Sequence, residues 1–310
     1  MWLLLACTSG KDSGGGETGA PDATRDLGDA FAADTLEGYV TYLASEELAG
    51  REAGSEGDLL GVAYIEAAFD AAGFEPLDGG WEQPFVDSAG TDSINVLGVR
   101  WGASDEIVIV GAHHDHLGVR GGEIFPGAND DASGVAVLLG LAEAFGSGAT
   151  PDRTLVLAAW GSEEVEIDGS RAYTEDPPAD LPLADTVHYV NLDMLGTYDA
   201  YEVIYALDAV RGTVAHRVVG AAADESPLYV DLAEYGELSD SVNFCEAGVP
   251  EVFFYTEDPA CYHSPCDTAD RLDYDDLSAV GELVGHVVDR FTDGALDLAT
   301  QRAAGCPVAR

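Results

Sequence analysis

Five short clusters of histidine and acidic residues along the 310-residue chain have the composition of a metal site. The clusters are Ala-His-His-Asp-His at 112–116, Gly-Ala-Asn-Asp-Asp-Ala-Ser-Gly at 127–134, Gly-Ser-Glu-Glu at 161–164, Asp193, and Tyr-His-Ser-Pro-Cys-Asp at 262–267. Imidazole groups mixed with carboxylates suit Zn²⁺ or a similar first-row ion better than Ca²⁺ or a soft metal. The residue types in these clusters therefore predict a zinc centre.

Four of the clusters follow apolar runs that have the length and composition of buried β-strands. The runs lie at 107–111, 154–160, 187–192 and 250–255, and helical patterns lie between several of them, at 132–145, 210–223 and 277–291. This alternation predicts an α/β fold, a single-domain three-layer α/β/α structure with a mostly parallel mixed sheet. Ligands of such sheets bind beyond the carboxyl ends of the strands, so we expect the clusters to converge in space.

The clusters also resemble, in order, the motifs of a known enzyme family. The motifs are HHD at 113–115, GANDDASG at 127–134, EE at 163–164, NLDM at 191–194 and CYHSPCDT at 261–268, with LAGREAGS at 48–55 as the entry segment. This series is similar to that of the secreted di-zinc aminopeptidases, which include bacterial leucyl-type aminopeptidases and have glutaminyl cyclases and glutamate carboxypeptidases as relatives. The resemblance covers roughly residues 40–290 and implies a zinc-exopeptidase-like fold.

Carried over position by position, the resemblance implies five metal ligands that hold two zinc ions per chain. They are His113, Asp130, Glu164, Asp193 and His263. Asp130 would bridge the ions, with His113 and Asp193 completing one site and Glu164 and His263 the other. Two Zn²⁺ ions, three carboxylates and one bridging hydroxide sum to zero charge, so a buried cluster of this composition is balanced.

The resemblance also implies catalytic roles for residues beside the ligands. Glu163 would be the general base for a zinc-bound hydroxide, and the Tyr262 hydroxyl would stabilise the developing oxyanion. Asp115 would accept the free ring N–H of His113, and Asp267 would do the same near His263. The peptide bond between Asp130 and Asp131 is expected to be cis.

The function that these residues predict is that of a zinc-dependent aminopeptidase acting on peptides with a free N-terminus. A glutaminyl cyclase on the same scaffold is an alternative, and so is a carboxypeptidase, which would need Arg120, Arg211 or Arg217 to hold the substrate carboxylate. A non-catalytic, lipid-anchored metal- or peptide-binding module is a third alternative. Structural zinc is usually closed by four protein ligands, so an open position and an unligated Glu163 favour the enzyme.

The predictions for other residues near the motifs are less specific. His114 and His116 are expected to line the cleft or to satisfy backbone carbonyls. Asp240, Phe244 and Tyr229 are weaker candidates for the substrate pocket, since aromatic residues in such segments are more often core. Glu166 stands where the family usually has glycine, which predicts an altered loop with metal binding retained.

The charge of the chain excludes some partners. Thirteen Lys and Arg residues against 58 Asp and Glu give a formal net charge of −45. A field of this sign repels nucleic acid and anionic lipid headgroups, so neither is an expected partner. Such a surface keeps a protein soluble and suits a monomer in a salty, extracytoplasmic setting.

The N-terminal sequence and the cysteines bear on location. Residues 1–7, which end in Leu-Leu-Ala-Cys, resemble a lipoprotein processing site with Cys7 as the lipidated residue, and 8–30 reads as a Gly/Ser-rich tether. The catalytic domain is predicted over 31–300 and a tail over 301–310. The family resemblance favours a disulfide between Cys261 and Cys266 over zinc thiolates, whereas Cys245 and Cys306 could be bridged or free. We therefore expect a cell-envelope lipoprotein or a secreted protein, with membrane contact only through Cys7.

Overall fold

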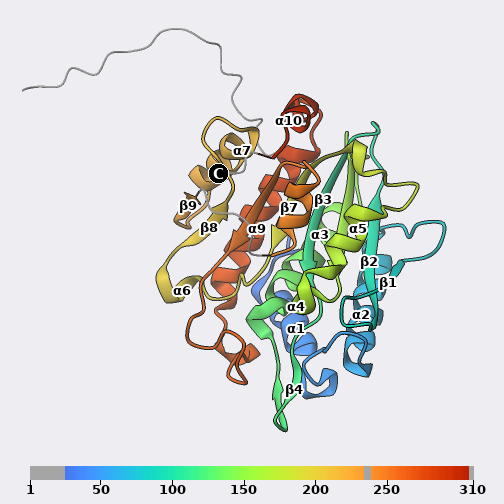
Figure 1. Ribbon diagram of the computed structural model, residues 1–310. Coiled ribbons are helices and arrows are strands. Elements are labelled where there is room, and N and C mark those ends of the chain that lie inside the picture. Colours follow the sequence, from blue (N-terminus) through green and yellow to red (C-terminus); the bar gives the residue numbers. More distant parts are fainter. Residues whose placement is uncertain (1–24, 234–238, 307–310) are drawn as a thin grey trace, which may run out of the picture.

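The computed structural model describes residues 25–233 and 239–306, and an eight-stranded sheet forms its centre (Figure 1). The strands, in their order across the sheet, are β1 (Glu82–Val86), β2 (Asp92–Arg100), β6 (Thr154–Trp160), β3 (Ile107–His113), β7 (Thr186–Leu192), β10 (Glu251–Tyr255), β8 (Ile204–Leu207) and β9 (Val230–Ala233). The four central strands β6, β3, β7 and β10 run parallel, and β2 and β8 pair antiparallel with their outer members. The predicted fold class is confirmed.

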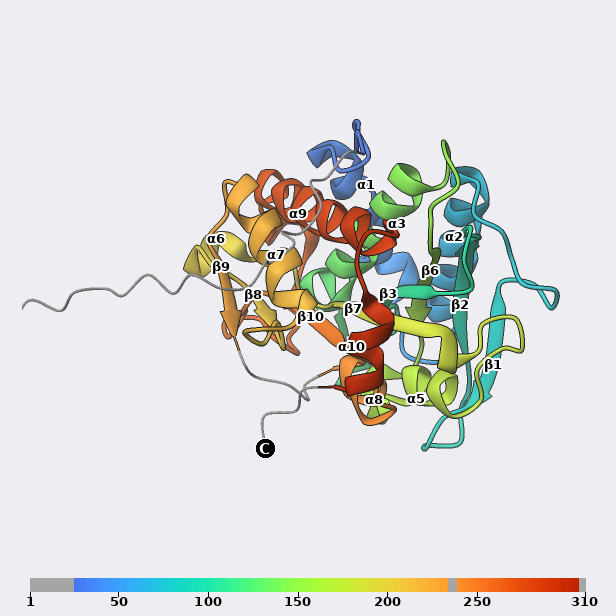
Figure 2. The ribbon, with the colours of Figure 1, turned by 90° about the horizontal axis from the view of Figure 1, so that it is seen from above.

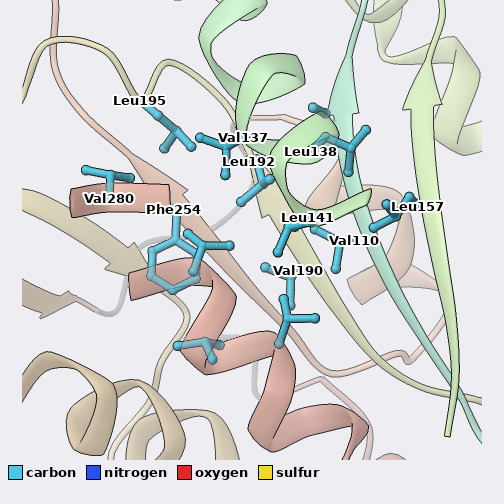
Figure 3. Packing of buried hydrophobic residues seen from close by; sticks show 14 of the residues in the cluster. Val110, Val137, Leu138, Leu141, Leu157, Val190, Leu192, Leu195, Phe254 and Val280 are labelled. Atoms are coloured by element: carbon cyan, nitrogen blue, oxygen red, sulfur yellow. The ribbon is translucent and has the colours of Figure 1, made fainter. Parts of the chain in front are cut away.

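The central strands are apolar because helices cover both faces of the sheet. Every residue of β3, β6 and β7 is buried. Such near-continuous runs of Val, Ile, Leu and Ala are what a sheet with two covered faces requires. Figure 3 shows Val110, Leu157 and Val190 from three of these strands packed against Val137 and Leu141 of helix α3 (Gly134–Phe145).

Viewed from above, the helices form a layer on each side of the sheet (Figure 2). One layer contains α1 (Ala33–Leu43), α2 (Glu56–Ala72), α3, α7 (Val214–Glu225) and α9 (Tyr274–Thr292). The other contains α5 (Asp168–Glu175), α8 (Ser241–Glu246) and α10 (Leu298–Ala304). Tyr173 and Phe244 of the second layer pack on Trp160 and Tyr189 of the sheet. The three layers predicted from the sequence are therefore present.

Capping residues explain where two helices differ from the sequence expectation. The side chain of Thr213 accepts the backbone N–H of His216, so α7 begins at Val214 and not at 210. Asp273 accepts the backbone N–H groups of Asp275 and Asp276, so α9 begins three residues before 277. Side-chain oxygens at such positions satisfy N–H groups that have no partner inside the helix.

Short elements lie at the carboxyl ends of the central strands, where the sequence clusters are. A hairpin of β4 (Gly118–Arg120) and β5 (Glu123–Phe125) follows β3. The segment Ala128–Ser133 precedes α3, and α4 (Glu163–Glu166) follows β6. Figure 1 shows β4 and α4 at the same end of the sheet. The remaining short elements are Glu46–Leu48, Leu183–Asp185, α6 (Tyr198–Tyr201) and Ala269–Arg271.

Two disulfides and the ends of the described chain complete the fold. Cys261 is bonded to Cys266, as the resemblance implied, and Cys245 is bonded to Cys306, which decides an alternative that the sequence left open. Leu27 is buried, so packing begins inside the segment predicted as a tether. The predictions for residues 1–7, for Cys7 and for most of 8–30 lie outside the described residues. In the described part of the chain, no helix is long and apolar enough to cross a membrane.

Candidate metal centre

The five predicted ligands come together at the carboxyl end of the central strands. His113 is the last residue of β3, Asp193 directly follows β7, and Glu164 lies in α4 just after β6. His263 lies in the loop after β10, and Asp130 lies in the segment before α3. Parallel strands end at one edge of a sheet, which is why residues 150 positions apart in sequence can meet there.

Asp130 lies between two groups of these residues. Its Oδ1 is 3.2 Å from Nε2 of His113, which is itself 3.6 Å from Oδ1 of Asp193. Its Oδ2 is 3.2 Å from Nε2 of His263, which is 3.1 Å from Oε2 of Glu164. Two ligand atoms that each lie about 2.0–2.1 Å from one tetrahedral zinc are roughly 3.3 Å apart. The spacing therefore fits two ions that share Asp130.

The buried polar atoms of the centre support the same fit. Oδ2 of Asp130, Oδ1 of Asp193 and Oε1 of Glu164 are buried without a hydrogen-bond partner among the described residues. Such groups are costly unless something pairs with them. These carboxylates lie near the imidazole nitrogens of His113 and His263. Cations bound between the carboxylates and the imidazoles would give the oxygens a partner. Which residues ligate an ion stays a prediction from the sequence.

The pKa values of the buried acidic groups also indicate that the centre binds cations. Burial raises the pKa of Glu163 well above the usual glutamate value and the pKa of Asp115 to about 6. Burial also opposes ionisation of Asp130, but its contacts with His113 and His263 outweigh burial and lower the pKa of this carboxyl. The protein thus gathers more acidic groups here than its own side chains can balance, and added positive charge would stabilise them.

Asp115 lies near His113, as predicted, but its carboxylate does not accept the His113 ring N–H. The Nδ1 atom of His113 lies 3.1 Å from the backbone oxygen of Asp115 and 3.8 Å from its carboxylate, so the carboxylate does not take this N–H. The Asp115 carboxylate instead accepts the backbone N–H groups of Glu163 (2.9 Å) and Glu164 (3.3 Å). The expected His113 contact is therefore corrected to the backbone carbonyl, and Asp115 fixes the first turn of α4.

Asp267 likewise serves a different ligand from the one expected. Its carboxylate accepts the backbone N–H of Asn129 at 2.8 Å and of Asp130 at 3.1 Å. It therefore holds the segment that carries the shared Asp130 and not the loop of His263. The peptide bond between Asp130 and Asp131 is cis, as the resemblance implied.

A cavity of about 240 Å³ opens onto the centre. Its lining residues are Asp130, Glu163, Asp193, Met194, Phe253, Tyr255, Tyr262 and His263. The Tyr262 ring stacks on His263 with the ring centroids 3.9 Å apart, and more than half of its surface is exposed. Glu163 and Tyr262 thus face the same space as the ligand groups, which is the arrangement that their predicted roles need.

Three weaker sequence candidates do not line this cavity. Phe244 is fully buried in the core and stacks on Tyr189, whereas Tyr229 is 64% exposed. Asp240 is fully buried below the centre, and burial raises its pKa to about 7. Glu166 is exposed at the end of α4.

Two further residues have defined places in the centre: Arg51 was assigned no role from the sequence, and His116 was expected to line the cleft or to satisfy a backbone carbonyl but does neither among the described residues. Arg51, within the entry segment, is 1% exposed and donates to the backbone oxygens of His114 (2.8 Å), Pro126 (2.8 Å) and Gly127 (2.9 Å). It therefore ties the end of β3 to the segment that carries Asp130. His116 lies beside Glu164; its only sequence signal was a third histidine in the cluster at 112–116.

The sequence also matches known proteins. The profile of Peptidase family M28 matches residues 95–288. Leupeptin-inactivating enzyme 1 of Streptomyces exfoliatus is 26% identical over 80% of this chain and 59% of its own length. Aminopeptidase YwaD of Bacillus subtilis is 30% identical over 62% of this chain and 43% of its own, and a probable lipoprotein aminopeptidase, LpqL, of Mycobacterium tuberculosis is 30% identical over 62% and 44%. The chain thus spans about half the length of these curated relatives.

Solved structures share the fold. A zinc aminopeptidase from Bacillus subtilis superposes with a TM-score of 0.72 at 19% identity, over 87% of this chain and 96% of that one. Glutaminyl cyclase from Porphyromonas gingivalis gives a TM-score of 0.70 at 21% identity, over 84% and 99%. At this level of identity the similarity establishes the architecture.

Proposed function

The chain belongs to peptidase family M28, and on that premise we propose that it is a metallo-aminopeptidase that uses two zinc ions to hydrolyse the N-terminal peptide bond of peptides. The observation that carries the proposal is the pair of ligand groups that share Asp130 and open, with Glu163, onto one cavity. His113 and Asp193 would complete one site, and Glu164 and His263 the other. The curated relatives, which include enzymes named aminopeptidases, support the same reaction.

Glu163 would be the general base of this reaction. Zinc, when bound, lowers the pKa of a coordinated water and polarises the scissile carbonyl. Glu163 accepts the proton of the attacking water and later gives it to the leaving amine. The carboxylate of Asp115 holds the backbone of Glu163 and Glu164, so the base and the adjacent ligand keep a fixed relation. The Tyr262 hydroxyl, whose pKa is raised by burial and the nearby acidic groups, stays protonated and can donate to the developing oxyanion.

The cavity supports cleavage at the N-terminus over cleavage at the C-terminus. With two Zn²⁺ ions balancing the ligand carboxylates, Glu163 is the remaining acidic group of the described lining, which contains no Lys or Arg to hold a substrate carboxylate. Of the arginines weighed for a carboxypeptidase, Arg120 pairs with Glu52 at the surface, and Arg217 donates to the backbone oxygen of Thr213, just before α7. Met194, Phe253 and Tyr255 supply apolar lining, which favours substrates whose first residue has an apolar side chain.

A substrate panel tests the proposal. The protein loaded with zinc should release amino acids from aminoacyl arylamides and short peptides, should not act on N-acetylated versions of them, and should lose the activity on chelation and regain it with zinc. Absence of turnover across the panel by protein that holds two zinc ions would exclude an aminopeptidase. Release of pyroglutamate from N-terminal glutamine would identify the cyclase alternative, and tight peptide binding without turnover would identify a binding module.

We also propose that the protein functions outside the cytoplasm, anchored through Cys7. Both disulfides favour an oxidising compartment, and LpqL, named a probable lipoprotein aminopeptidase, is a relative. Expression of the full chain in a bacterial host should give a membrane-associated, lipid-labelled protein, whereas Cys7→Ser should release it. Equal fractionation of the two forms would contradict the anchor.

A further inference from the structure

His116 is a buried histidine whose ring is held against the proposed metal centre. It is 1% exposed, and its backbone N–H donates to the backbone oxygen of Arg51 at 3.0 Å. Gly127, at φ +63°, faces the ring so closely that a Cβ there would come within 2.5 Å of the imidazole Cγ. The ring also lies edge-on to that of His263, with the centroids 5.9 Å apart. The position of His116 is therefore fixed by the backbone on two sides.

The His116 ring has one nitrogen close to one oxygen of Glu164. Its Nδ1 lies 2.7 Å from Oε1 of Glu164, whereas the other oxygen, Oε2, is 3.1 Å from Nε2 of His263. Among the described residues, neither Nδ1 of His116 nor Oε1 of Glu164 has a partner with hydrogen-bond geometry, so the two atoms are close but not aligned. Contact with His116 lowers the pKa of Glu164 against the effect of burial. The two oxygens of Glu164 thus have separate neighbours.

The distances separate two roles that His116 could have. Two donors that share a tetrahedral zinc are roughly 3.3 Å apart, and the proposed ligand pairs lie between 3.1 and 3.6 Å. The His116–Glu164 distance of 2.7 Å is shorter than that spacing and lies in the distance range of a charge-assisted hydrogen bond, which a rotation of the imidazole or the carboxylate would align. His116 Nδ1 is 3.9 Å from the shared Asp130. These distances favour a hydrogen-bond donor over a sixth metal ligand.

We propose that His116 is a positioning residue that donates its Nδ1–H to Oε1 of Glu164 and so directs Oε2 toward the metal site shared with His263 and Asp130. The inference rests on the proposed two-zinc function. Hydrogen bonds to ligand carboxylates fix their orientation, and their loss typically lowers metal affinity by about 10–100-fold. Asp115 holds the backbone of Glu164, and His116 would hold its carboxylate.

Zinc titration by calorimetry, without substrate, tests this role. In His116→Ala we expect one of the two zinc ions to bind about 10–100-fold more weakly, with kcat reduced at saturating zinc and KM little changed. His116→Asn places an amide N–H near the position of Nδ1 and should restore most of the affinity. His188→Ala, which removes a buried imidazole packed on Phe291 far from the ligands, should keep both affinities and controls for a general loss of packing.

The outcomes distinguish failure of this inference from failure of the function. Unchanged affinity for both ions in His116→Ala would overturn the positioning role. If His116→Asn binds zinc as weakly as His116→Ala, and the visible absorption of the Co²⁺ form changes energy in both, then His116 is a ligand and the proposal is wrong. A wild-type protein that binds no zinc would instead overturn the proposed metal centre itself.

Discussion

The two ends of strand β6 place buried charge in opposite circumstances. At its amino end, Arg153 is 3% exposed, and its guanidinium donates four hydrogen bonds, to Glu106 at 2.6 Å and to the backbone oxygens of Phe291, Asp293 and Leu296. At its carboxyl end, Glu164 joins Asp130 and Asp193, each with a buried carboxylate oxygen that has no hydrogen-bond partner among the described residues, and Glu163 precedes Glu164 in the chain. The first end is complete as folded, whereas the second is built to receive charge from a ligand.

A structural buried charge differs from a functional one in whether protein groups pair with it. A buried charge whose donors all have partners stabilises one arrangement of the chain. A cluster of like charges without partners costs folding free energy and persists where it serves a site. The two ends of one strand should therefore respond to substitution in opposite ways, one in stability and the other in turnover.

The largest effect is expected at the carboxyl end. Glu163→Gln removes the general base, and kcat should fall by about 10²–10⁴-fold. Because burial already opposes the charge of Glu163, the melting temperature should stay the same or rise. Steady-state kinetics and thermal unfolding of the same zinc-loaded samples measure both quantities. Glu166→Gln, on the exposed part of the same short helix, is the matched control, and a similar loss there would remove the special role of Glu163.

A smaller effect of the opposite kind is expected at the amino end. Arg153→Met leaves three backbone oxygens without their donor and should lower the free energy of unfolding by about 3 kcal/mol. The kcat of the molecules that remain folded should be unchanged, because the centre lies at the other end of β6. Arg120→Met, which removes an exposed ion pair with Glu52, should cost less than about 1 kcal/mol. Denaturant unfolding measures the free energy of unfolding of both variants. Equal losses in Arg153→Met and Arg120→Met would refute the difference between the buried and the exposed ion pair.

The smallest effect is expected at a buried acid away from the centre that has no basic partner among the described residues. Glu251, at the start of β10, is 3% exposed, and burial and the neighbouring Asp208 raise its pKa well above the usual value. The folded state therefore holds this proton more tightly than the unfolded state, and stability present at low pH is lost as pH rises from the unfolded pKa through the folded one. Glu251→Gln should remove this loss, raising the unfolding free energy at pH 8 by about 1 kcal/mol relative to pH 5.

Melting temperatures at the two pH values provide the measurement. The exposed Glu246→Gln variant serves as the control for adding an amide near the Cys245–Cys306 bridge. A Glu251→Gln variant with the same pH dependence as the wild-type protein would show that Glu251 is ionised in the folded state.

The strands, their covered faces and the residue types at their ends could be predicted from the amino-acid sequence. An uninterrupted apolar run such as 154–160 is typical of a strand that is buried on both faces in the middle of a sheet. Parallel strands bring the residues that follow such runs to one edge of the sheet. This is why the approach of His113, Asp193 and Glu164 could be predicted although they are distant in the chain.

The hydrogen-bond partners of the residues that support the predicted ligands become visible only in the folded chain. Asp267 was expected beside His263 and holds Asn129 and Asp130, while Asp115 holds the backbone of α4. The structure also places His116 and Arg51 in the centre and pairs Cys245 with Cys306 in a disulfide. These contacts depend on the paths of the loops between strands, and a hydrogen bond between residues 138 positions apart leaves no periodic pattern in the sequence. Local periodicity encodes the frame, but the pairing of polar groups is fixed only when distant loops pack together.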